Sequence, residues 1–351
     1  MMAAVFFCSA ALTGVARAYA LHRGMVDRPN RRSSHTLDTP RGGGIAFVLV
    51  YLSVLTGSFF FPIEGVRLTD TFFFALLLGG GLVALVGFID DHRHLPARLR
   101  FSVHLAAAVV AVWVLGSPPV NLASWAPAGD WWMSILFVIA LVWLLNLYNF
   151  MDGIDAIAGL QGITVLCQGA VILILNTSGL DAAYWLLMLA SAIAGFLLWN
   201  WPPAKIFMGD AASGFVGFSL GVIALYTANH YPISIWSWLI LLGVFAVDAT
   251  WTLGVRVLRG ERWYEAHAKH AYQILARHRQ ALNDATGMSI EQARAEAHKW
   301  VVVRILLINL FWLMPLAWLA SVAPSYGLLL TLIAFLPLSL LAWRLGAGRD
   351  W

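Results

Sequence analysis

Long apolar runs alternate with short polar loops along the whole chain. Eleven of these runs approach the length of about 20 residues that a helix needs to cross a membrane. They cover approximately residues 2–21, 43–62, 71–90, 99–116, 132–149, 155–175, 183–201, 213–229, 234–257, 301–322 and 326–345. The pattern predicts an all-α fold, a polytopic transmembrane helical bundle with about 10–11 transmembrane helices. Because no soluble linker divides the chain, we expect residues 1–351 to form a single integral membrane domain.

The composition excludes a water-soluble protein. Of the residues, 60% are hydrophobic and only 11% are charged, whereas soluble domains carry about 25% charged residues. Two cysteines within apolar runs give neither a disulfide framework nor a zinc site. The net charge of +4 does not indicate nucleic acid as a partner, because the basic residues follow the alternation of the loops.

The distribution of the basic residues predicts the orientation. Of the 22 Lys and Arg residues, all but Arg17 and Arg67 fall in one alternate set of loops. Basic loops stay in the cytoplasm, so the N-terminus is expected outside and the C-terminus inside. The first apolar run has no positively charged start, so we interpret it as a retained span and not as a signal peptide. The longest cytoplasmic loop then covers about residues 258–300.

Four short polar signatures interrupt the apolar runs, and all of them fall at predicted cytoplasmic ends. The signatures lie at residues 87–91, 146–155, 207–214 and 267–273. Carboxylates beside hydrocarbon are costly and indicate a functional site. Several carboxylates at one depth indicate a site for a metal ion and phosphate groups, and not polar residues scattered for structural reasons.

The first signature places Asp90 and Asp91 at the end of the third run. Adjacent acids at a helix C-terminus oppose the helix dipole and need a compensating cation, which Arg93, Arg98 or Arg100 could supply. One interpretation is a solvated helix end with local ion pairs. In the second interpretation, one of the two acids lies near a metal-bound phosphate and its neighbour acts as a base or an orienting group.

In the second signature, Asn149, Asp152 and Asp155 recur every three residues. This spacing places them along one face of a helix or, in an irregular loop, around a polar pocket. With Asn146 the run holds two carboxylates and two amides, which packing alone explains poorly. Hard oxygen ligands of this kind suit Mg²⁺ or Mn²⁺ and not zinc.

The third signature places Asp210 where the eighth run begins. An Asp at a helix start can be simply an N-cap. The functional interpretation draws on its neighbours, because Lys205 could meet a phosphate and Phe207 could stack on a base.

The fourth signature carries His267 and His270 beside Lys269. A zinc site would want a further ligand at suitable spacing, and His-Glu-x-x-His is absent. Imidazoles that face phosphate oxygens fit better, although an amphipathic surface helix with incidental histidines is the alternative. His278 and His298 are interpreted as incidental.

The first cytoplasmic loop is a fifth candidate. Its glycines at 42–44 could expose backbone N–H groups to an anion, or they could serve close helix packing. His35 in this loop and Lys205 are candidates for contacting a lipid phosphate or supporting the loop.

Together these motifs resemble the polyprenyl-phosphate N-acetylhexosamine-1-phosphate transferase family, glycosyltransferase family 4. Two stretches are specific, the Asn-x-x-Asn-x-x-Asp-Gly-x-Asp of residues 146–155 and the Phe-Met-Gly-Asp of residues 207–210. The resemblance extends from about Asp27 to Gln273 and includes the undecaprenyl-phosphate GlcNAc-1-phosphate transferases.

Two departures separate the chain from the phospho-MurNAc-pentapeptide translocases of the same family. Those proteins have three consecutive histidines where this chain has His267-Ala-Lys-His270. They also have a lysine where Thr36 stands here. The chain therefore looks more like the branch that initiates O-antigen or capsule chains.

The resemblance implies a role for each motif. Asp210 and Asn149 would bind Mg²⁺ (or Mn²⁺), and the catalytic Asp90 and Asp91 would lie at the phosphates, with one of them a candidate base. The residues implied in nucleotide-sugar binding are Asn146, Asp152, Asp155, Phe207, Arg98, His267 and His270.

The implied reaction transfers an N-acetylhexosamine-1-phosphate from a UDP-sugar (a UDP-N-acetylhexosamine) to undecaprenyl phosphate and releases UMP. The protein would be a phosphotransferase in the bacterial inner (plasma) membrane, with a periplasmic N-terminus and an active site on the cytoplasmic face. Membrane lipids are expected partners, nucleic acid is not, and a homodimer is left open. The sequence does not specify which N-acetyl sugar is transferred or which cell-surface glycan is built.

Two other functional classes compete with this interpretation. A secondary transporter would place an acidic coupling-ion site near the middle of the membrane, whereas these acids lie at helix ends. An intramembrane prenyltransferase would want two Asp-x-x-x-Asp motifs, and neither Asp90-Asp91 nor Asp152-x-x-Asp155 has that spacing.

Overall fold

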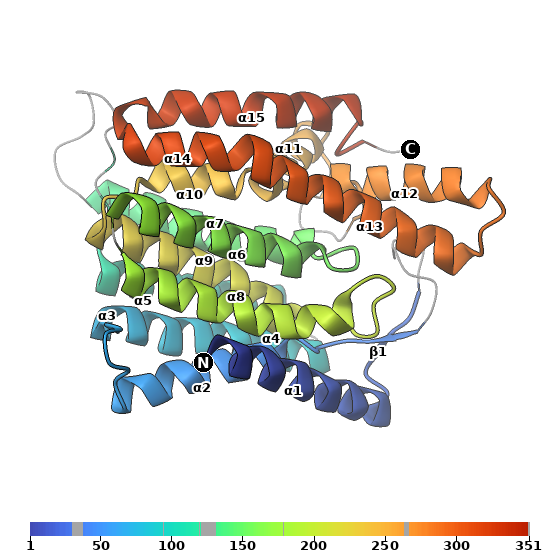
Figure 1. Cartoon of the computed structure of the whole chain (residues 1–351). Helices are drawn as coiled ribbons and strands as arrows, with labels where there is room; N and C mark the ends of the chain where they lie inside the picture. The colour runs from blue at the N-terminus through green and yellow to red at the C-terminus, as the bar shows by residue number, and fades with distance from the viewer. Residues whose placement is uncertain are drawn as a thin grey trace.

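The fold is a bundle of long helices that run roughly along one direction (Figure 1). The computed structural model describes residues 1–29, 38–93, 95–118, 120, 131–177, 179–262 and 267–349. Within these residues the strands are limited to β1 (Val26–Asp27) and β2 (Thr39–Pro40), which pair antiparallel with Val26 opposite Pro40.

The helices follow one another with short connections. In chain order they are α1 (Met2–Arg23), α2 (Ile45–Phe60), α3 (Asp70–Phe74), η1 (Ala75–Gly80), α4 (Gly81–Arg93), α5 (Ala97–Leu115), α6 (Trp131–Met151), α7 (Ile157–Thr177), α8 (Leu180–Asn200), α9 (Asp210–His230), α10 (Ile235–Leu241), α11 (Gly243–Leu258), α12 (Ala271–Asp284), α13 (Ile290–Ile308), η2 (Asn309–Leu313), α14 (Met314–Val322), η3 (Pro324–Tyr326) and α15 (Gly327–Arg344).

The expected polytopic helical bundle is confirmed, and each predicted run corresponds to a helix or a helix pair. Within the described residues, nine helices are long and apolar enough to cross a membrane. The run at 234–257 is a broken span, because α10 and α11 meet at an angle of 73°. The run at 43–62 gives α2, which has 16 residues and is shorter than a full span.

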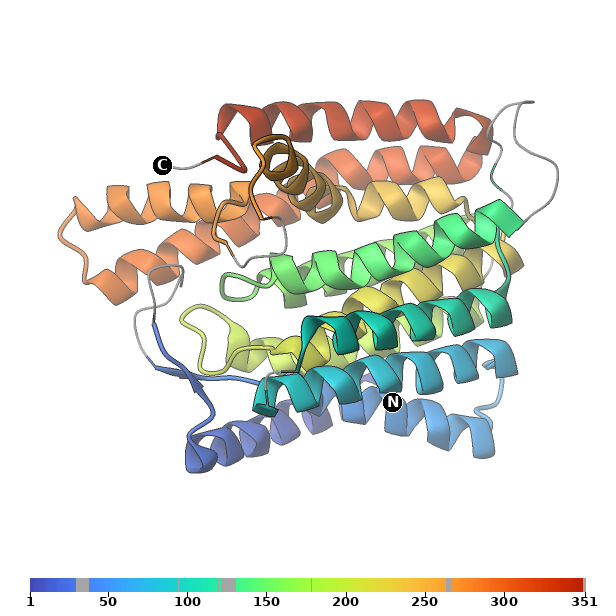
Figure 2. The ribbon, with the colours of Figure 1, turned by 180° about the vertical axis from the view of Figure 1, so that it is seen from behind.

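One boundary differs clearly from the prediction. The tenth run was expected to begin at 301, but α13 begins at Ile290 and continues through η2 and α14 to Val322. A capping box between Ser289 and Gln292 fixes this start. The first turns of α13 are charged, so apolar length alone does not detect them. With α12 they form a hairpin that extends past the end of the bundle (Figures 1 and 2).

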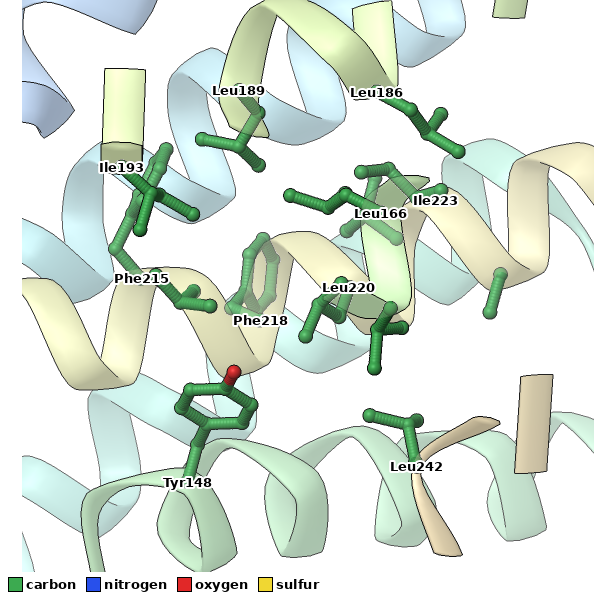
Figure 3. Close-up of a cluster of buried hydrophobic side chains, with 14 of the residues drawn as sticks. Tyr148, Leu166, Leu186, Leu189, Ile193, Phe215, Phe218, Leu220, Ile223 and Leu242 are labelled. Atoms are coloured by element: carbon green, nitrogen blue, oxygen red, sulfur yellow. The ribbon is translucent and has the colours of Figure 1, made fainter. Parts of the chain in front are cut away.

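Helix α9 lies at the centre of the bundle. Its residues from Ala211 to Thr227 are all buried, and it packs against α4 and α6. Small residues permit this close approach, as in other membrane helices: a Cβ on Gly217 would lie 2.9 Å from the Leu144 carbonyl oxygen. Figure 3 shows the surrounding core, where Phe215 and Phe218 of α9 lie among large apolar side chains. The packing holds the start of α9 beside the ends of α4 and α6.

Candidate functional site

Three aspartates meet where α4 ends and α9 begins. The Asp91 carboxylate accepts hydrogen bonds from the backbone N–H groups of Asp210, at 3.3 Å, and Ala211, at 3.4 Å. Asp91 therefore caps α9, a favourable place for a negative charge. The close approach requires Gly87, because a Cβ there would lie 2.5 Å from the Ala211 nitrogen. The simple N-cap interpretation of Asp210 is wrong, since Gly209 holds that position and the Asp210 side chain makes no capping bond.

Arg100 supplies the compensating cation. Its Nη1 lies 2.6 Å from Asp90 Oδ2 and 3.6 Å from Asp210 Oδ2. The other Asp90 oxygen accepts a hydrogen bond from the backbone N–H of Leu95 at 2.6 Å. Arg98, two residues earlier, is exposed, and its side chain has no hydrogen bond or ion pair with the residues that the structure describes. The arginine brought to the acids is thus Arg100 and not Arg98.

Asn149 orients the Asp210 carboxylate. Its Nδ2 donates to Asp210 Oδ1 at 2.8 Å and to Ser213 Oγ at 3.1 Å. Asn149 lies in the last turn of α6, which ends at Met151. The second signature is therefore a helix end followed by a polar loop, and not one face of a continuous helix. Asn146, one turn earlier, donates to the Val142 carbonyl within α6 at 2.7 Å.

Asp152 begins the loop after α6, directly beyond the turn that carries Asn149. It is half-buried. Burial raises the pKa of Asp152 to about 7, and the negative charges of Asp210, Asp155 and Asp91 add to the shift. The carboxylates of Asp91, Asp152, Asp155 and Asp210 thus interact electrostatically at this end of the bundle. We call Asp90, Asp91, Asp152 and Asp210, with Arg100, the acidic centre.

Asp155 is enclosed and is not open to a ligand. Its side chain is 2% exposed, and Oδ2 lies 3.1 Å from the Ala204 nitrogen and 3.2 Å from His298 Nδ1. Burial raises the pKa of Asp155, but the bond from His298, the Ala204 N–H and the charge of Arg294 outweigh it and lower the pKa below its usual value. The interpretation of His298 as incidental is wrong. No local signal joins two residues that are 143 positions apart.

Asn200, which the sequence pattern did not mark, ties the loop before α7 to the loop before α9. Its Oδ1 accepts from the Ala156 N–H at 2.9 Å, and its Nδ2 donates to the Ile206 carbonyl at 2.9 Å. Ala156 has a φ of 67°, in the left-handed region, so this bond holds a strained turn.

Gly43 and Gly44, in the loop between α1 and α2, serve packing. Gly43 N–H donates to the Phe207 carbonyl at 2.9 Å, and Gly44 N–H donates to the Met208 carbonyl at 3.0 Å. Because these groups are engaged, they do not present an anion site. Phe207 is half-buried, and Lys205 is exposed with its Nζ 5.8 Å from the centre of the Trp199 ring. His35 lies outside the described residues.

The two histidines of the fourth signature precede α12 and do not lie on it. Their ring centres are 4.8 Å apart. Burial lowers the pKa of His267 to about 3, and the positive neighbours His270, Arg256 and Lys269 lower it further. His267 is therefore a neutral imidazole at physiological pH, and its Nδ1 accepts the Lys269 N–H at 3.3 Å.

Asp248 on α11, absent from the predictions, organises the start of α12. It accepts the N–H groups of Ala271 at 2.9 Å and Tyr272 at 3.0 Å, and it lies 3.4 Å from His270 Nδ1. Tyr272 in turn donates to the Phe150 carbonyl at 3.4 Å. The histidine segment is thus joined to the loop that carries Asp152.

The four signatures therefore gather at one end of the bundle, as predicted. The opposite end is marked by Asn229, near the end of α9, which donates to the Leu115 carbonyl at 3.0 Å. The structure does not define which end faces the cytoplasm, so the orientation stays a prediction.

The acidic centre suits a hard cation by its chemistry. Among the described residues no three His, Cys, Asp or Glu side chains are arranged to hold a metal ion. Mg²⁺ commonly uses only one or two carboxylates and completes its shell with water and substrate phosphates. Asp210 is the accessible carboxylate, with its side chain 40% exposed, while Asp90 is 8% exposed. Asn149 turns its nitrogen toward Asp210, so its role as a direct ligand stays a prediction.

Comparison with known proteins gives a consistent assignment. The sequence model described as glycosyl transferase family 4 matches residues 73–228. A probable undecaprenyl-phosphate N-acetylglucosaminyl 1-phosphate transferase from Bacillus subtilis is 30% identical over 70% of this chain and 68% of its own length.

Two further relatives have similar names. A decaprenyl-phosphate N-acetylglucosaminephosphotransferase from Mycolicibacterium smegmatis is 35% identical over 63% of this chain, which spans only 57% of that relative. An undecaprenyl-phosphate alpha-N-acetylglucosaminyl 1-phosphate transferase from Yersinia pestis is 29% identical over 78% of this chain and 75% of its own length. The chain is thus a multi-pass membrane transferase that belongs to glycosyl transferase family 4, the polyprenyl-phosphate N-acetylhexosamine-1-phosphate transferases.

Proposed function

We propose that the protein transfers N-acetylglucosamine-1-phosphate, or a closely related N-acetylhexosamine-1-phosphate, from a UDP-sugar to undecaprenyl phosphate. An oxygen of the lipid phosphate attacks the sugar-linked phosphorus. The bond from that phosphorus to UMP breaks, UMP leaves, and a lipid diphosphate sugar forms. The names of the relatives support the lipid and the sugar phosphate.

The observation that carries the proposal is the acidic centre with Arg100 at the ends of α4, α6 and α9. Phosphoryl transfer needs positioning and charge neutralisation more than covalent help from the protein. The second pKa of a phosphate monoester is about 6, so the lipid nucleophile is largely ionised already. A strong base is therefore unnecessary, and the acids act through geometry and charge.

Each group of the centre has a distinct task in this proposal. Asp210, oriented by Asn149, would hold Mg²⁺ (or Mn²⁺), and the cation would supply positive charge to neutralise the diphosphate of the substrate. Asp91 fixes the start of α9 and with it the position of Asp210. Arg100, the cation of the centre, contacts the phosphates in the place that the resemblance gave to Arg98.

The nucleoside side of the site includes Asp152 and Phe207. Asp152 is half-buried beside the centre. Phe207 is held in place because its own N–H donates to the Pro40 carbonyl and its carbonyl accepts from the Gly43 N–H. His267 contributes a neutral imidazole to this side, because burial lowers its pKa to about 3.

The site faces the cytoplasm of the bacterial inner membrane in this proposal, since nearly all basic residues fall in the loops at its end. The product would start a cell-surface glycan such as O-antigen, capsule or another wall polymer. Labelling of single cysteines in intact cells tests the orientation. A cysteine at position 280 that reacts from outside without permeabilisation would contradict it.

The activity is tested with purified protein, undecaprenyl phosphate and a panel of UDP-N-acetylhexosamines, with UMP release as the measurement. We expect UMP only when lipid phosphate and Mg²⁺ are both present. Uptake of a UDP-sugar into proteoliposomes without release of UMP would instead support a transporter. Release of UMP without lipid would contradict the proposed acceptor.

A further inference from the structure

The loop that carries Asp152 is held from the α12–α13 hairpin by a buried group of charged side chains. Asp155 and His298 are each 2% exposed, and Asp155 Oδ2 lies 3.2 Å from His298 Nδ1. A buried carboxylate with a hydrogen-bonding imidazole is far more strongly fixed than an exposed pair. None of the four sequence signatures includes His298, which lies near the middle of α13.

Arg294, one turn earlier on α13, adds a positive charge to the same place. It is 4% exposed, and its Nε and Nη1 are buried without a hydrogen-bond partner. A buried guanidinium is costly unless a negative charge compensates it. The positive charge of Arg294 is also among the causes that lower the pKa of Asp155.

The other end of the loop is held by independent bonds. The Ala204 N–H donates to the same Asp155 oxygen at 3.1 Å, and Asn200 accepts the Ala156 N–H at 2.9 Å. Tyr272 on α12 reaches the Phe150 carbonyl at 3.4 Å, and a Cβ on Gly153 would collide with its hydroxyl. The loop is thus fixed between the hairpin on one side and the α8–α9 connection on the other.

We infer that His298 is a positioning residue, which through Asp155 fixes the loop so that Asp152 faces the acidic centre. The α12–α13 hairpin is then a supporting wall of the nucleotide half of the site and not an appendage. Asp155 acts from within this wall and does not touch the nucleotide itself. The part of the inference that concerns the nucleotide rests on the proposed function, whereas the part that concerns the loop does not.

Hydrogen–deuterium exchange of peptides covering residues 150–156 tests the positioning role. In His298→Ala we expect exchange there to rise roughly tenfold or more, because Asp155 loses the buried imidazole that accepts its N–H at 3.4 Å and lies 3.2 Å from its carboxylate. His298→Asn places an amide N–H near the position of the imidazole Nδ1 and should restore most of the protection. Lys299→Ala is the matched control, because Lys299 pairs only with the exposed Glu296 among the described residues. If the alanine variant does not fold, His298→Gln takes its place.

The Michaelis constants of the same variants test which substrate the loop serves. We expect KM for the UDP-sugar to rise about tenfold in His298→Ala, a difference of about 1.4 kcal/mol, while KM for the lipid phosphate stays as in Lys299→Ala. Loop exchange in His298→Ala equal to that of the control would overturn the inference. Exchange that rises across the whole protein, with both KM values raised alike, would overturn it too. Absence of UMP release by the unsubstituted protein would instead reject the proposed function, and the exchange data would still decide the inference.

Discussion

Two polar clusters lie within this apolar bundle, and they differ in both charge and position. The acidic centre lies at the helix ends, carries four carboxylates and one guanidinium, and leaves Asp210 open. The second cluster lies inside the bundle and consists of three neutral amides, Gln161, Gln168 and Asn309, each at most 4% exposed.

The amides bond to main chain at two irregular points. Asn309 Nδ2 donates to Gln161 Oε1 at 2.7 Å, and Gln161 Nε2 reaches the Leu241 carbonyl at 3.4 Å, where α10 breaks from α11. Gln168 donates to the Asn309 carbonyl at 2.9 Å, at the start of the π-helix η2. Neutral amides inside a membrane bundle therefore satisfy backbone groups that irregular helices leave free. In the proposed function, the charged oxygens at the open end serve the chemistry, and this difference would separate a structural cluster from a reactive one.

The largest expected effect is in the acidic centre. Asp210→Asn keeps the shape of the side chain but removes its charge, so UMP release should fall roughly 10²–10³-fold, the loss of about 3–4 kcal/mol of transition-state stabilisation. Because Asp91 and not Asp210 caps α9, the thermal stability should stay near that of the unsubstituted protein. Near-normal activity at low Mg²⁺ would place the metal elsewhere.

Arg100→Gln should have the next largest effect. This substitution removes the cation between Asp90 and Asp210. A hydrogen bond to a charged group contributes about 1.5–3 kcal/mol, and loss of that stabilisation in the transition state should lower UMP release roughly 10–100-fold. Arg98→Gln is the matched control on the same helix and should change the rate less than about twofold, as surface substitutions usually do. Equal losses of UMP release in the two variants, measured at saturating substrate, would contradict the assignment of Arg100, and not Arg98, to the acidic centre.

Substitution in the amide cluster should change stability and leave the chemistry intact. Asn309→Leu leaves Gln161 Oε1 buried without its donor, at a cost of about 1–3 kcal/mol in the free energy of unfolding. The rate of UMP release per folded molecule should stay unchanged. A variant that folds normally but loses turnover would show that the two clusters are coupled.

The smallest expected effect concerns pH. Folding lowers the pKa of His267 from 6.5 to about 3, so between these values the unfolded chain binds a proton that the folded chain does not. Stability should therefore fall as the pH decreases below 6.5. His267→Asn should make the melting temperature less sensitive to acid over this range. An unchanged slope would show that His267 is solvated in the folded protein.

The sequence predicts the helices of this fold better than the contacts of its site. Apolar length and the carboxylate motifs suffice for the bundle and for the gathering of the motifs at one end. The choice between Arg98 and Arg100 depends on helical phase, because two residues turn a helix by about 200°. The Asp155–His298 pair and the cap of α9 by Asp91 join residues 143 and 119 positions apart, and only the packed helices bring such residues together.

The central claim is that the sugar-linked phosphate moves with the sugar. The most direct measurement uses UDP-N-acetylglucosamine with a radiolabel in that phosphate, together with undecaprenyl phosphate, Mg²⁺ and the purified protein. The account predicts that the label appears in the lipid product in equal amount to unlabelled UMP, and that Asp210→Asn reduces both alike. Label that stays in UDP while sugar appears on the lipid would contradict it, because the bond broken would then be the one between sugar and phosphate.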